Sequence, residues 1–397
     1  MSNKSCVCNN TSLPYRPVVI VHGLMTGDVS TMQHLATNIT KIHPGTKTYV
    51  INRFCGLASL EPLWRQTKLL ADDLLYICSL HPEGVHVIGY SQGGLIVRGM
   101  LEMCGNEHNV KTFVSLSSPQ GGQYGAECFT KMFPALTTRT AYELFYSRLG
   151  QRALSVANYW YDPRHRDLYL KYSVYLAVID NLKPEESNIG HLLKIKDGDK
   201  NKINDSILNT TNLFYTSSDD TIIVQSNEDE TKIIETHVSV AIAAVTTATI
   251  KVAEGHDDDN STQERFTSAA TIDSIMTDTL VNNVNLSYLE DDYPNAKSNT
   301  RKIGLARLQR MVLIGGPDDG VISPWQSSQF AVLDSTGGLI QLRNRQQDDV
   351  FSNNDPIGLR QLDMTGRLIE YTVPGVHHHE WHHNEKVLNE CIIYWLD

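Results

Sequence analysis

Residues 84–94 read Gly-Val-His-Val-Ile-Gly-Tyr-Ser-Gln-Gly-Gly, and positions 89–93 within them fit the pattern G-x-S-x-G. An apolar run, Val85–Gly89, predicts a strand before the serine, and Leu95–Met103 predicts a helix after it. A serine on such a sharp turn projects from the top of a sheet, and the flanking glycines leave room for strand and helix to approach. An ordinary glycine-rich turn is the plain alternative. The placement between strand and helix favours a nucleophile at Ser91.

Apolar runs and helix-period segments alternate on both sides of this turn, as they do in α/β proteins. Further strands are predicted at Pro17–Val21, Lys47–Asn52, Thr112–Leu116, Met311–Ile314 and Leu368–Val373. Helices are predicted from Ser30, a residue that can cap a helix, to about His43, after Pro62, and over Asn384–Leu396. Because a crossover helix brings successive strands into parallel alignment, the pattern predicts a mostly parallel, doubly wound sheet.

A serine nucleophile needs a base and an acid, which in the α/β-hydrolase fold follow the serine in chain order at the ends of later strands. The strand Met311–Ile314 runs into a turn that contains Asp318 and Asp319. We favour Asp319, because the hydrolase register places an apolar residue three positions after the acid and a proline two positions further. Asp is also a common turn residue, so a structural role is the plain alternative. The base is expected in the run His377–His379, which follows the strand Leu368–Val373.

The tetrahedral intermediate of such a reaction needs two amide donors for its oxyanion. Gln92 supplies one as the residue after the nucleophile, and Leu24, in the loop after the first strand, is predicted to supply the other. The preceding His22-Gly23 can also be an ordinary turn at the end of a strand, so this role depends on the rest of the constellation.

An aromatic-rich segment lies between the strands Thr112–Leu116 and Met311–Ile314. Nine of the 34 residues at positions 142–175 are aromatic: Tyr142, Phe145, Tyr146, Tyr159, Trp160, Tyr161, Tyr169, Tyr172 and Tyr175. We expect a helical cap over about residues 119–180, above the strand ends, with Tyr159 and Trp160 as candidate contacts of an acyl chain. The packed core of a subdomain explains the aromatic residues equally well.

The charge of the chain is uneven. Its 397 residues contain 34 Lys and Arg against 45 Asp and Glu, and the net charge of -11 argues against a nucleic-acid partner held by phosphate contacts. Residues 181–292 alone carry 8 basic and 21 acidic residues, with no Cys or Trp. We expect this stretch to be an acidic insertion, disordered or loosely structured and dispensable for the chemistry. The exception is the apolar stretch Val238–Val252, whose pattern fits a strand or a short helix equally well. The chain then divides into a polar N-terminal segment, residues 1–14, and a hydrolase domain, residues 15–397, that includes the cap and the insertion.

Signals for the cellular compartment conflict. No run reaches the roughly 18 apolar residues of a membrane-spanning helix, which predicts a protein without a transmembrane segment. Asn-x-Ser/Thr sequons, about twice as many as chance gives, favour the secretory pathway; they begin at Asn3, Asn9, Asn10, Asn38, Asn204, Asn209, Asn260 and Asn285. Against this, the polar N-terminus contains no apolar stretch of the kind found in signal peptides. The seven cysteines, scattered and odd in number, do not decide the redox compartment.

One motif points to different chemistry. Residues 379–383, His-Glu-Trp-His-His, fit H-E-x-x-H, which on a helix binds zinc through two histidines with a glutamate base between them. The extended zinc pattern fails at Lys386 and Asn389, and the motif begins in a loop straight after Gly375. A zinc peptidase is therefore the weaker alternative, and no metal or organic cofactor is predicted.

With these residues in place, the chain resembles the palmitoyl-protein thioesterase family. The resemblance is carried by HGL at 22–24, HPGT at 43–46, PLW at 62–64, GVHVIGYSQGG at 84–94, HNVKTFVSLSSPQGGQYG at 108–125, NYWYDP at 158–163, DLYL at 167–170 and VLIGGPDDGVISPWQSS at 312–328. It implies an α/β-hydrolase that acts in the lysosome on long-chain fatty acyl thioesters, without a cofactor. It also places the catalytic triad at Ser91, Asp319 and His378, the last through the family's G-x-x-H spacing from Gly375.

The resemblance implies palmitoyl-CoA or S-palmitoylated peptides and proteins as substrates, with acyl-CoA and similar small thioesters favoured. A lipase or carboxylesterase acting on oxyesters uses the same triad, and a non-catalytic carrier of acyl chains is a further alternative. Three features depart from the family pattern: the acidic insertion, the missing signal peptide and the run of histidines that obscures the base. The sequence makes no prediction of oligomeric state.

Overall fold

The computed structural model describes residues 15–26, 29–125, 138–182, 213–218, 220–226, eight positions between 231 and 243, 303–345 and 349–397. The predicted N-terminal segment, part of the predicted cap and most of the predicted insertion lie outside the described residues, as does most of the apolar stretch Val238–Val252.

Within the described residues the chain forms an eight-stranded sheet, in which seven strands run parallel and one edge strand, β5, is antiparallel. The strands are β1 Val18–Val21, β2 Thr48–Asn52, β3 Val85–Tyr90, β4 Val110–Leu116, β5 Leu213–Ser218, β6 Thr221–Gln225, β7 Arg310–Gly315 and β10 Leu368–Thr372. Their order across the sheet is β10-β7-β4-β3-β1-β2-β6-β5. The predicted mostly parallel sheet is therefore confirmed.

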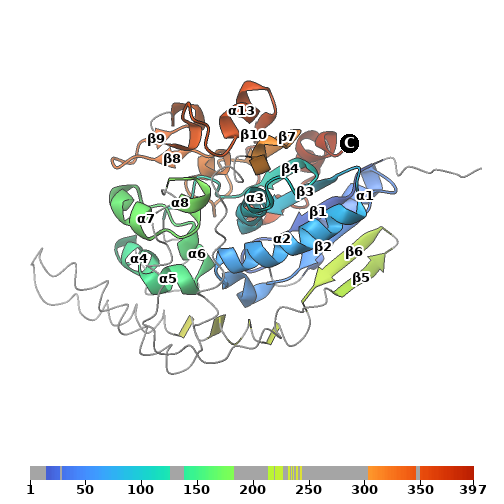
Figure 1. The fold of residues 1–397 in the computed structure, drawn as a ribbon, viewed down its shortest axis with the longest axis horizontal. Coiled ribbons are helices and arrows are strands. Elements are labelled where there is room, and N and C mark those ends of the chain that lie inside the picture. Colours follow the sequence, from blue (N-terminus) through green and yellow to red (C-terminus); the bar gives the residue numbers. More distant parts are fainter. Residues whose placement is uncertain are drawn as a thin grey trace, which may run out of the picture.

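Helices cover both faces of this sheet (Figure 1), because the strands are apolar on both sides. Val19 and Val87 pack into one core, whereas Ile20 and Ile88 pack into the other. The first core contains residues of α2 (Leu63–Leu80) and α3 (Gln92–Cys104), and the second contains residues of α1 (Ser30–Ile42) and of the C-terminal helical segments. This two-sided packing is that of a doubly wound α/β fold.

A group of short helices from the segment predicted as a cap lies beside the sheet (Figure 1). The helices are α4 Thr138–Phe145, α5 Arg148–Ala153, α6 Ser155–Asn158, η3 Pro163–His165, α7 Arg166–Tyr172 and α8 Leu176–Ile179. Their aromatic rings pack on one another, with centroids of Phe145 and Trp160 5.1 Å apart. Arg98 of α3, fully buried, pairs with Glu102 and with Asp180 after α8, which anchors the cap to the helix that follows Ser91.

Residues 213–225 correct the predicted insertion. β6 pairs in parallel with β2, so that Thr221 lies beside Thr48, and β5 pairs with β6. Ile223 and Val224 of β6 are fully buried, one in each core. The expectation that residues 181–292 are disordered or loose outside Val238–Val252 is therefore wrong for these two strands. A buried strand needs only a short apolar run, which the acidic average of the stretch conceals.

Two boundaries also differ from the prediction. Val29, not Ser30, occupies the cap position of α1. The predicted closing helix is divided into α14 Glu385–Val387, a π-helical turn η10 Leu388–Ile392 and a 3₁₀ turn η11 Ile393–Trp395. The other elements are η1 Gly56–Leu60, η6 Trp325–Gln329, β8 Val332–Leu333, β9 Leu339–Ile340, η7 Leu342–Asn344, η8 Asp349–Phe351, α13 Leu359–Met364 and η9 His378–Glu380. In the part of the chain that the structure describes, no helix has the length and apolar character needed to cross a membrane.

The strand order places the candidate residues together. Parallel strands end at the same edge of a sheet, and β3, β4, β7 and β10 are consecutive neighbours. Ser91 follows β3, Ser117 follows β4, Asp319 lies in the loop after β7, and His378 lies in the loop after β10. The fold thus brings four residues that are far apart in sequence to one edge of the sheet.

Candidate active site

Ser91 lies in the strained turn that the motif predicts, between β3 and α3. Its φ of 53° and ψ of -127° fall in a region that residues other than glycine rarely adopt. A Cβ atom on Gly89 would lie 2.5 Å from Cα of Gly94, and one on Gly93 would lie 2.4 Å from the carbonyl oxygen of His22. Glycine is required on both sides of Ser91, because strand, helix and the loop after β1 approach this closely.

Ser91, His378 and Asp319 form a continuous chain of hydrogen bonds. Nε2 of His378 lies 2.9 Å from Oγ of Ser91, and Nδ1 lies 3.0 Å from both carboxylate oxygens of Asp319. The main-chain N–H of His378 also donates to the carbonyl oxygen of Asp319 at 2.8 Å, which joins the two loops. An imidazole held in this way can accept the proton of the serine hydroxyl while the carboxylate orients its other nitrogen.

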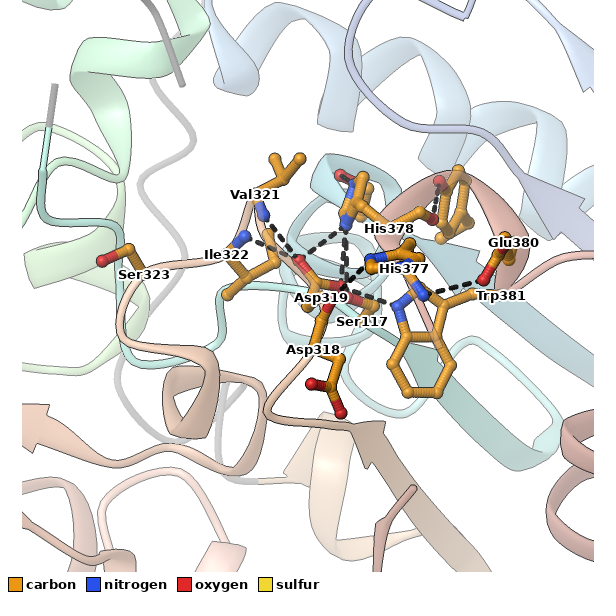
Figure 2. Close-up of polar contacts among 12 residues, drawn as sticks. Ser117, Asp318, Asp319, Val321, Ile322, Ser323, His377, His378, Glu380 and Trp381 are labelled. Atoms are coloured by element: carbon orange, nitrogen blue, oxygen red, sulfur yellow. Dashed lines mark hydrogen bonds and ion pairs between the residues drawn. The ribbon is translucent and has the colours of Figure 1, made fainter. Parts of the chain in front are cut away.

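Four further groups donate hydrogen bonds to the buried carboxylate of Asp319 (Figure 2). Oδ1 accepts the main-chain N–H of Val321 at 3.0 Å and that of Ile322 at 2.7 Å. Oδ2 accepts the hydroxyl of Ser117 at 2.5 Å and the indole N–H of Trp381 at 2.6 Å. All the donors approach a single carboxylate that is sealed from solvent.

These contacts keep Asp319 ionised. Burial by itself raises the pKa of the carboxyl group. The hydrogen bond and charge of His378, the N–H of Ile322 and the hydroxyl of Ser117 lower the pKa by more than burial raises it, and the result is about 2. The carboxylate is therefore negatively charged from neutral pH down to well below pH 4.

Tyr90 fixes His378 from the side of β3. Its hydroxyl donates to the carbonyl oxygen of His378 at 2.6 Å, and its ring stacks on the imidazole with centroids 5.3 Å apart. Burial raises the pKa of Tyr90 well above its ordinary value, so the hydroxyl remains a donor.

Sequence reasoning did not assign roles to Ser117, Trp381 or Tyr90. The only signal for Ser117 was its position directly after a predicted strand, because its contact with Asp319 joins residues far apart in the chain. Its φ of 45° is a left-handed conformation that a serine adopts at a cost, and such strain is common at functional sites. Trp381 lies inside the H-E-x-x-H motif, where attention falls on the histidines.

The neighbours of the predicted acid and base make other contacts. Oδ2 of Asp318 accepts the N–H of Gly375 at 2.7 Å, and Nδ1 of His377 lies 2.9 Å from the carbonyl oxygen of Asp318. Asp318, His377 and His379 are all exposed, whereas Asp319 and His378 are buried. Asp319 and His378 are therefore the buried pair that contact each other, and their roles as acid and base stay a prediction.

The two residues predicted to supply oxyanion donors lie on segments that approach each other. Gln92 is the first residue of α3, and Leu24 follows β1 by three positions. The close approach of Gly93 to His22 brings the start of α3 and the loop after β1 together. The Gln92 side chain is buried, and its Nε2 donates to the carbonyl oxygen of Ser59 at 2.8 Å.

Tyr159 and Trp160, the candidate acyl-chain contacts, lie inside the cap. They are 4% and 0% exposed, and the ring of Trp160 packs against Phe145 and Tyr124. This position is that of a packed subdomain core, and contact of either residue with an acyl chain stays a prediction.

The H-E-x-x-H residues do not lie on one α-helix. His379 and Glu380 belong to the 3₁₀ turn η9, and His382 and His383 follow in a separate turn. Glu380 instead accepts the main-chain N–H of His377 at 3.0 Å. Among the described residues, no group of three or more His, Cys, Asp or Glu is arranged to hold a metal ion. The arrangement gives no support to a zinc peptidase.

A doubly wound sheet with serine, histidine and aspartate at neighbouring strand ends defines an enzyme of the α/β-hydrolase class. The family model of palmitoyl protein thioesterases matches residues 17–236 and 260–378. The chain belongs to the palmitoyl-protein thioesterase family, and it is a thioester hydrolase.

Relatives match along almost the whole chain. The chain is 34% identical over 393 residues to the lysosomal thioesterase PPT2 homolog of Drosophila melanogaster. This alignment covers 99% of this chain and 96% of the relative. It is 31% identical over 383 residues to the lysosomal thioesterase PPT2 of Rattus norvegicus, covering 96% of this chain and 88% of the relative. Among solved structures, 28% of the chain aligns with 43% of the Bacillus licheniformis lipase BlEst2, at 25% identity and a TM-score of 0.23.

The family match also corrects the predicted insertion. It runs through residue 236 and resumes at residue 260, so only residues 237–259 of the acidic stretch lie outside it. The expectation that all of residues 181–292 is foreign to the family is wrong, because the matched part includes β5 and β6 of the sheet.

Proposed function

We propose that this enzyme hydrolyses long-chain fatty acyl thioesters through an acyl-enzyme intermediate on Ser91. The observation that carries the proposal is the hydrogen-bonded sequence from Asp319 through His378 to Ser91, in a chain that belongs to the palmitoyl-protein thioesterase family. Palmitoyl-CoA and S-palmitoylated peptides or proteins are the proposed substrates. No cofactor has a role in the proposed mechanism.

Acylation begins at Ser91. Its hydroxyl proton passes to Nε2 of His378 while Oγ forms a bond to the thioester carbonyl carbon. The resulting oxyanion accepts hydrogen bonds from the main-chain N–H groups of Leu24 and Gln92. The oxyanion then re-forms the carbonyl as the carbon–sulfur bond breaks, the departing thiolate takes the proton from His378 and leaves as the thiol, and the acyl group remains on Ser91 as an oxyester. Asp319 stays ionised and stabilises the imidazolium that forms.

Deacylation repeats the same proton transfers with water. His378 accepts a proton from the water molecule, whose oxygen attacks the ester carbonyl carbon. Leu24 and Gln92 donate again to the oxyanion. The bond between the carbonyl carbon and Oγ then breaks, the proton returns from His378 to Ser91, and the fatty acid leaves.

The proposed location is the lysosome or the secretory pathway. Two supports are the sequons in the sequence and the relatives from Drosophila melanogaster and Rattus norvegicus, whose names call them lysosomal thioesterases. Protein purified from its native cell should lose mass when treated with an N-glycosidase, and an unchanged mass together with a non-lysosomal distribution would contradict this location.

Substrate class is tested with one acyl chain on three carriers: palmitoyl-CoA, an S-palmitoylated peptide, and the same peptide with serine in place of the acylated cysteine. The proposal expects kcat/KM for the two thioesters to exceed that for the oxyester. A clear preference for the oxyester would replace the proposal with a lipase or carboxylesterase. A Ser91→Ala variant controls for background hydrolysis.

A fluorophosphonate probe separates an enzyme from a carrier of acyl chains. The proposal expects covalent labelling of Ser91 in the wild-type protein and its loss in His378→Ala, because the serine is then no longer deprotonated by a base. Binding of palmitate without any labelling would favour the non-catalytic carrier.

A further inference from the structure

Two buried side chains without a part in the proposed proton transfers lie beside the loop that carries Leu24. Ser59 is fully buried in η1, and His22 is 4% exposed at the end of β1. Each makes hydrogen bonds to the main chain on one side of Leu24.

Ser59 holds the peptide that follows Leu24. Its Oγ accepts the N–H of Met25 at 2.7 Å and donates to the carbonyl oxygen of Gly56 at 2.6 Å. A second link, from the N–H of Gly56 to the carbonyl oxygen of Thr26 at 2.6 Å, joins the same two segments. Met25 has a φ of 56°, a left-handed conformation that a methionine keeps only where its surroundings hold it.

His22 holds the peptide that precedes Leu24. Nδ1 of His22 lies 2.8 Å from the carbonyl oxygen of Gly23, and the hydroxyl of Thr26 donates to the same oxygen at 3.3 Å. This carbonyl and the N–H of Leu24 belong to one planar trans peptide, so they point in opposite directions. Holding the carbonyl toward His22 therefore fixes the direction of the Leu24 N–H.

The surroundings of His22 also set its protonation. Nε2 lies 2.6 Å from the carbonyl oxygen of Arg53, so each ring nitrogen faces a carbonyl oxygen, which can only accept. Only the charged ring donates from both nitrogens at once, and Nε2 also lies 3.4 Å from Sγ of Cys55. Burial lowers the pKa of His22, but Cys55 and the two carbonyls raise it more, to about 9.

Ser59 also contacts the second oxyanion donor residue. Its carbonyl oxygen accepts Nε2 of Gln92 at 2.8 Å, as well as Nε2 of Gln66 at 3.0 Å and the hydroxyl of Ser155 at 2.9 Å. The main chain of Gln92 carries the other N–H of the proposed oxyanion hole. One residue therefore connects the loop after β1, the start of α3 and the cap.

We infer that Ser59 and His22 are positioning residues that shape the oxyanion hole before a substrate binds. The inference rests on the proposed function, because it takes the amides of Leu24 and Gln92 as the oxyanion donors. Donors that are already aimed at the oxyanion need no reorganisation when the tetrahedral intermediate forms. Ser59 and His22 are therefore expected to stabilise the transition state without changing how tightly the acyl chain binds.

Ser59→Ala removes the hydroxyl that holds Met25 and leaves the carbonyl contacts in place. Removing an oxyanion donor outright costs on the order of 10²–10³ in kcat, so loosening one donor is expected to lower kcat about tenfold with KM for palmitoyl-CoA nearly unchanged. Ser147→Ala is the matched control, because Ser147 is equally buried and its Oγ also accepts an N–H, from Gly150, and donates to a carbonyl, of Leu144. This control should lose stability but keep kcat.

A pair of inhibitors gives a readout that partial unfolding does not change. A palmityl trifluoromethyl ketone forms a tetrahedral adduct with an oxyanion, whereas the palmityl-CoA thioether has no carbonyl group. For Ser59→Ala, Ki of the ketone should rise about tenfold while Ki of the thioether stays the same. Equal changes for both inhibitors, or the same kcat loss in Ser147→Ala, would overturn the inference.

Two substitutions of His22 test the direction of the Leu24 peptide. The amide nitrogen of Asn can replace Nδ1, which faces Gly23, and that of Gln can replace Nε2, which faces Arg53. The inference expects His22→Asn to retain more of kcat than His22→Gln. The reverse order would contradict it. If Ser91→Ala itself kept full turnover, the proposed function would fail, and this outcome is distinct from normal kcat in the Ser59 and His22 variants.

Discussion

Trp381 donates its indole N–H to Oδ2 of Asp319 at 2.6 Å, although the two residues are 62 positions apart in the chain. The same oxygen accepts the hydroxyl of Ser117, which β4 presents from a left-handed backbone. The carboxylate of Asp319 is thus held by Ser117 at the end of β4 and by Trp381 in the segment after His378. Its orientation depends on two segments of the chain other than its own loop.

Trp381→Phe should lower kcat about tenfold, because a hydrogen bond to a charged group contributes about 1.5–3 kcal/mol and only part of this is lost in the transition state. The ring is kept, so packing changes little. With a donor removed, the pKa of Asp319 rises from about 2. Because more of the carboxylate is then protonated in acid, the loss of kcat relative to the wild type should grow as the assay pH is lowered. The measurement is kcat for palmitoyl-CoA across acidic pH.

Trp395→Phe is the control for this substitution, since Trp395 also donates its indole N–H, to Tyr371 at 3.2 Å, away from the site. Ser117→Ala should behave as Trp381→Phe does. An unchanged pH profile in both variants would show that these donors do not support the carboxylate.

Asp319→Asn should nearly abolish turnover in a folded protein, with a loss on the order of 10⁴, because the imidazole is then held in the wrong tautomer. Asp318→Asn, one position earlier, is the matched control and should keep most activity, since Asp318 is exposed and contacts Gly375. Normal turnover in Asp319→Asn with loss in Asp318→Asn would move the acid one residue back.

Among the three consecutive histidines, only His378→Ala should nearly abolish activity, whereas His377→Ala and His379→Ala should retain most of it. Nε2 of His378 meets Ser91, whereas His377 and His379 are exposed. Turnover by the three alanine variants under one set of conditions decides this, and a larger loss for either neighbour would reassign the base.

Deleting residues 185–290 should destabilise the protein, contrary to what the acidic composition of this stretch predicts. The deletion removes β5 and β6, exposing the edge of β2, and it takes Ile223 and Val224 out of the two cores. Ile223→Ala alone should cost about 2–5 kcal/mol of the free energy of unfolding, measured in urea. Deletion of residues 251–300, which keeps both strands, is expected to retain acyl hydrolysis. Cooperative unfolding at wild-type urea concentrations by the larger deletion would refute the structural role of the strands.

The sequence predicts the features that depend on residues close together in the chain, and it does not predict contacts between residues far apart in the chain. The turn at Ser91 and the parallel strands each depend on a few consecutive residues, and both agree with the structure. Asp319, predicted as the acid from its register, contacts His378. β6 depends on pairing with β2, more than 150 positions earlier in the chain, and β5 pairs with β6, so an acidic average concealed both strands. Ser117 and Trp381 were missed for the same reason, because their contacts with Asp319 arise only when the strands align.

His108 should make the protein less stable in acid. Its Nδ1 accepts the N–H of Val110 at 3.2 Å and its Nε2 lies 2.9 Å from the carbonyl oxygen of Gly304, an arrangement that requires the neutral ring. Burial lowers the pKa of His108 to about 4, against about 6.5 in the unfolded chain. Between these two values the unfolded chain binds the extra proton, so stability falls as the pH falls from about 6.5 toward 4, by up to about 3 kcal/mol.

Urea unfolding at pH 7.5 and at pH 5 measures this effect. The loss of unfolding free energy on acidification should be smaller in His108→Gln than in the wild type, and the contribution of the other histidines cancels in this comparison. An equal loss in both proteins would mean that His108 is protonated without cost in the folded state.

Intact-protein mass spectrometry after rapid mixing with palmitoyl-CoA and acid quenching tests the central claim most directly, because it observes the covalent intermediate itself. The account predicts a palmitoyl adduct on the wild-type protein, mapped by peptide analysis to Ser91, and no adduct on Ser91→Ala or His378→Ala. Hydrolysis by the wild type without an adduct, or an adduct on a cysteine that survives in Ser91→Ala, would contradict a serine thioesterase built on Ser91, His378 and Asp319.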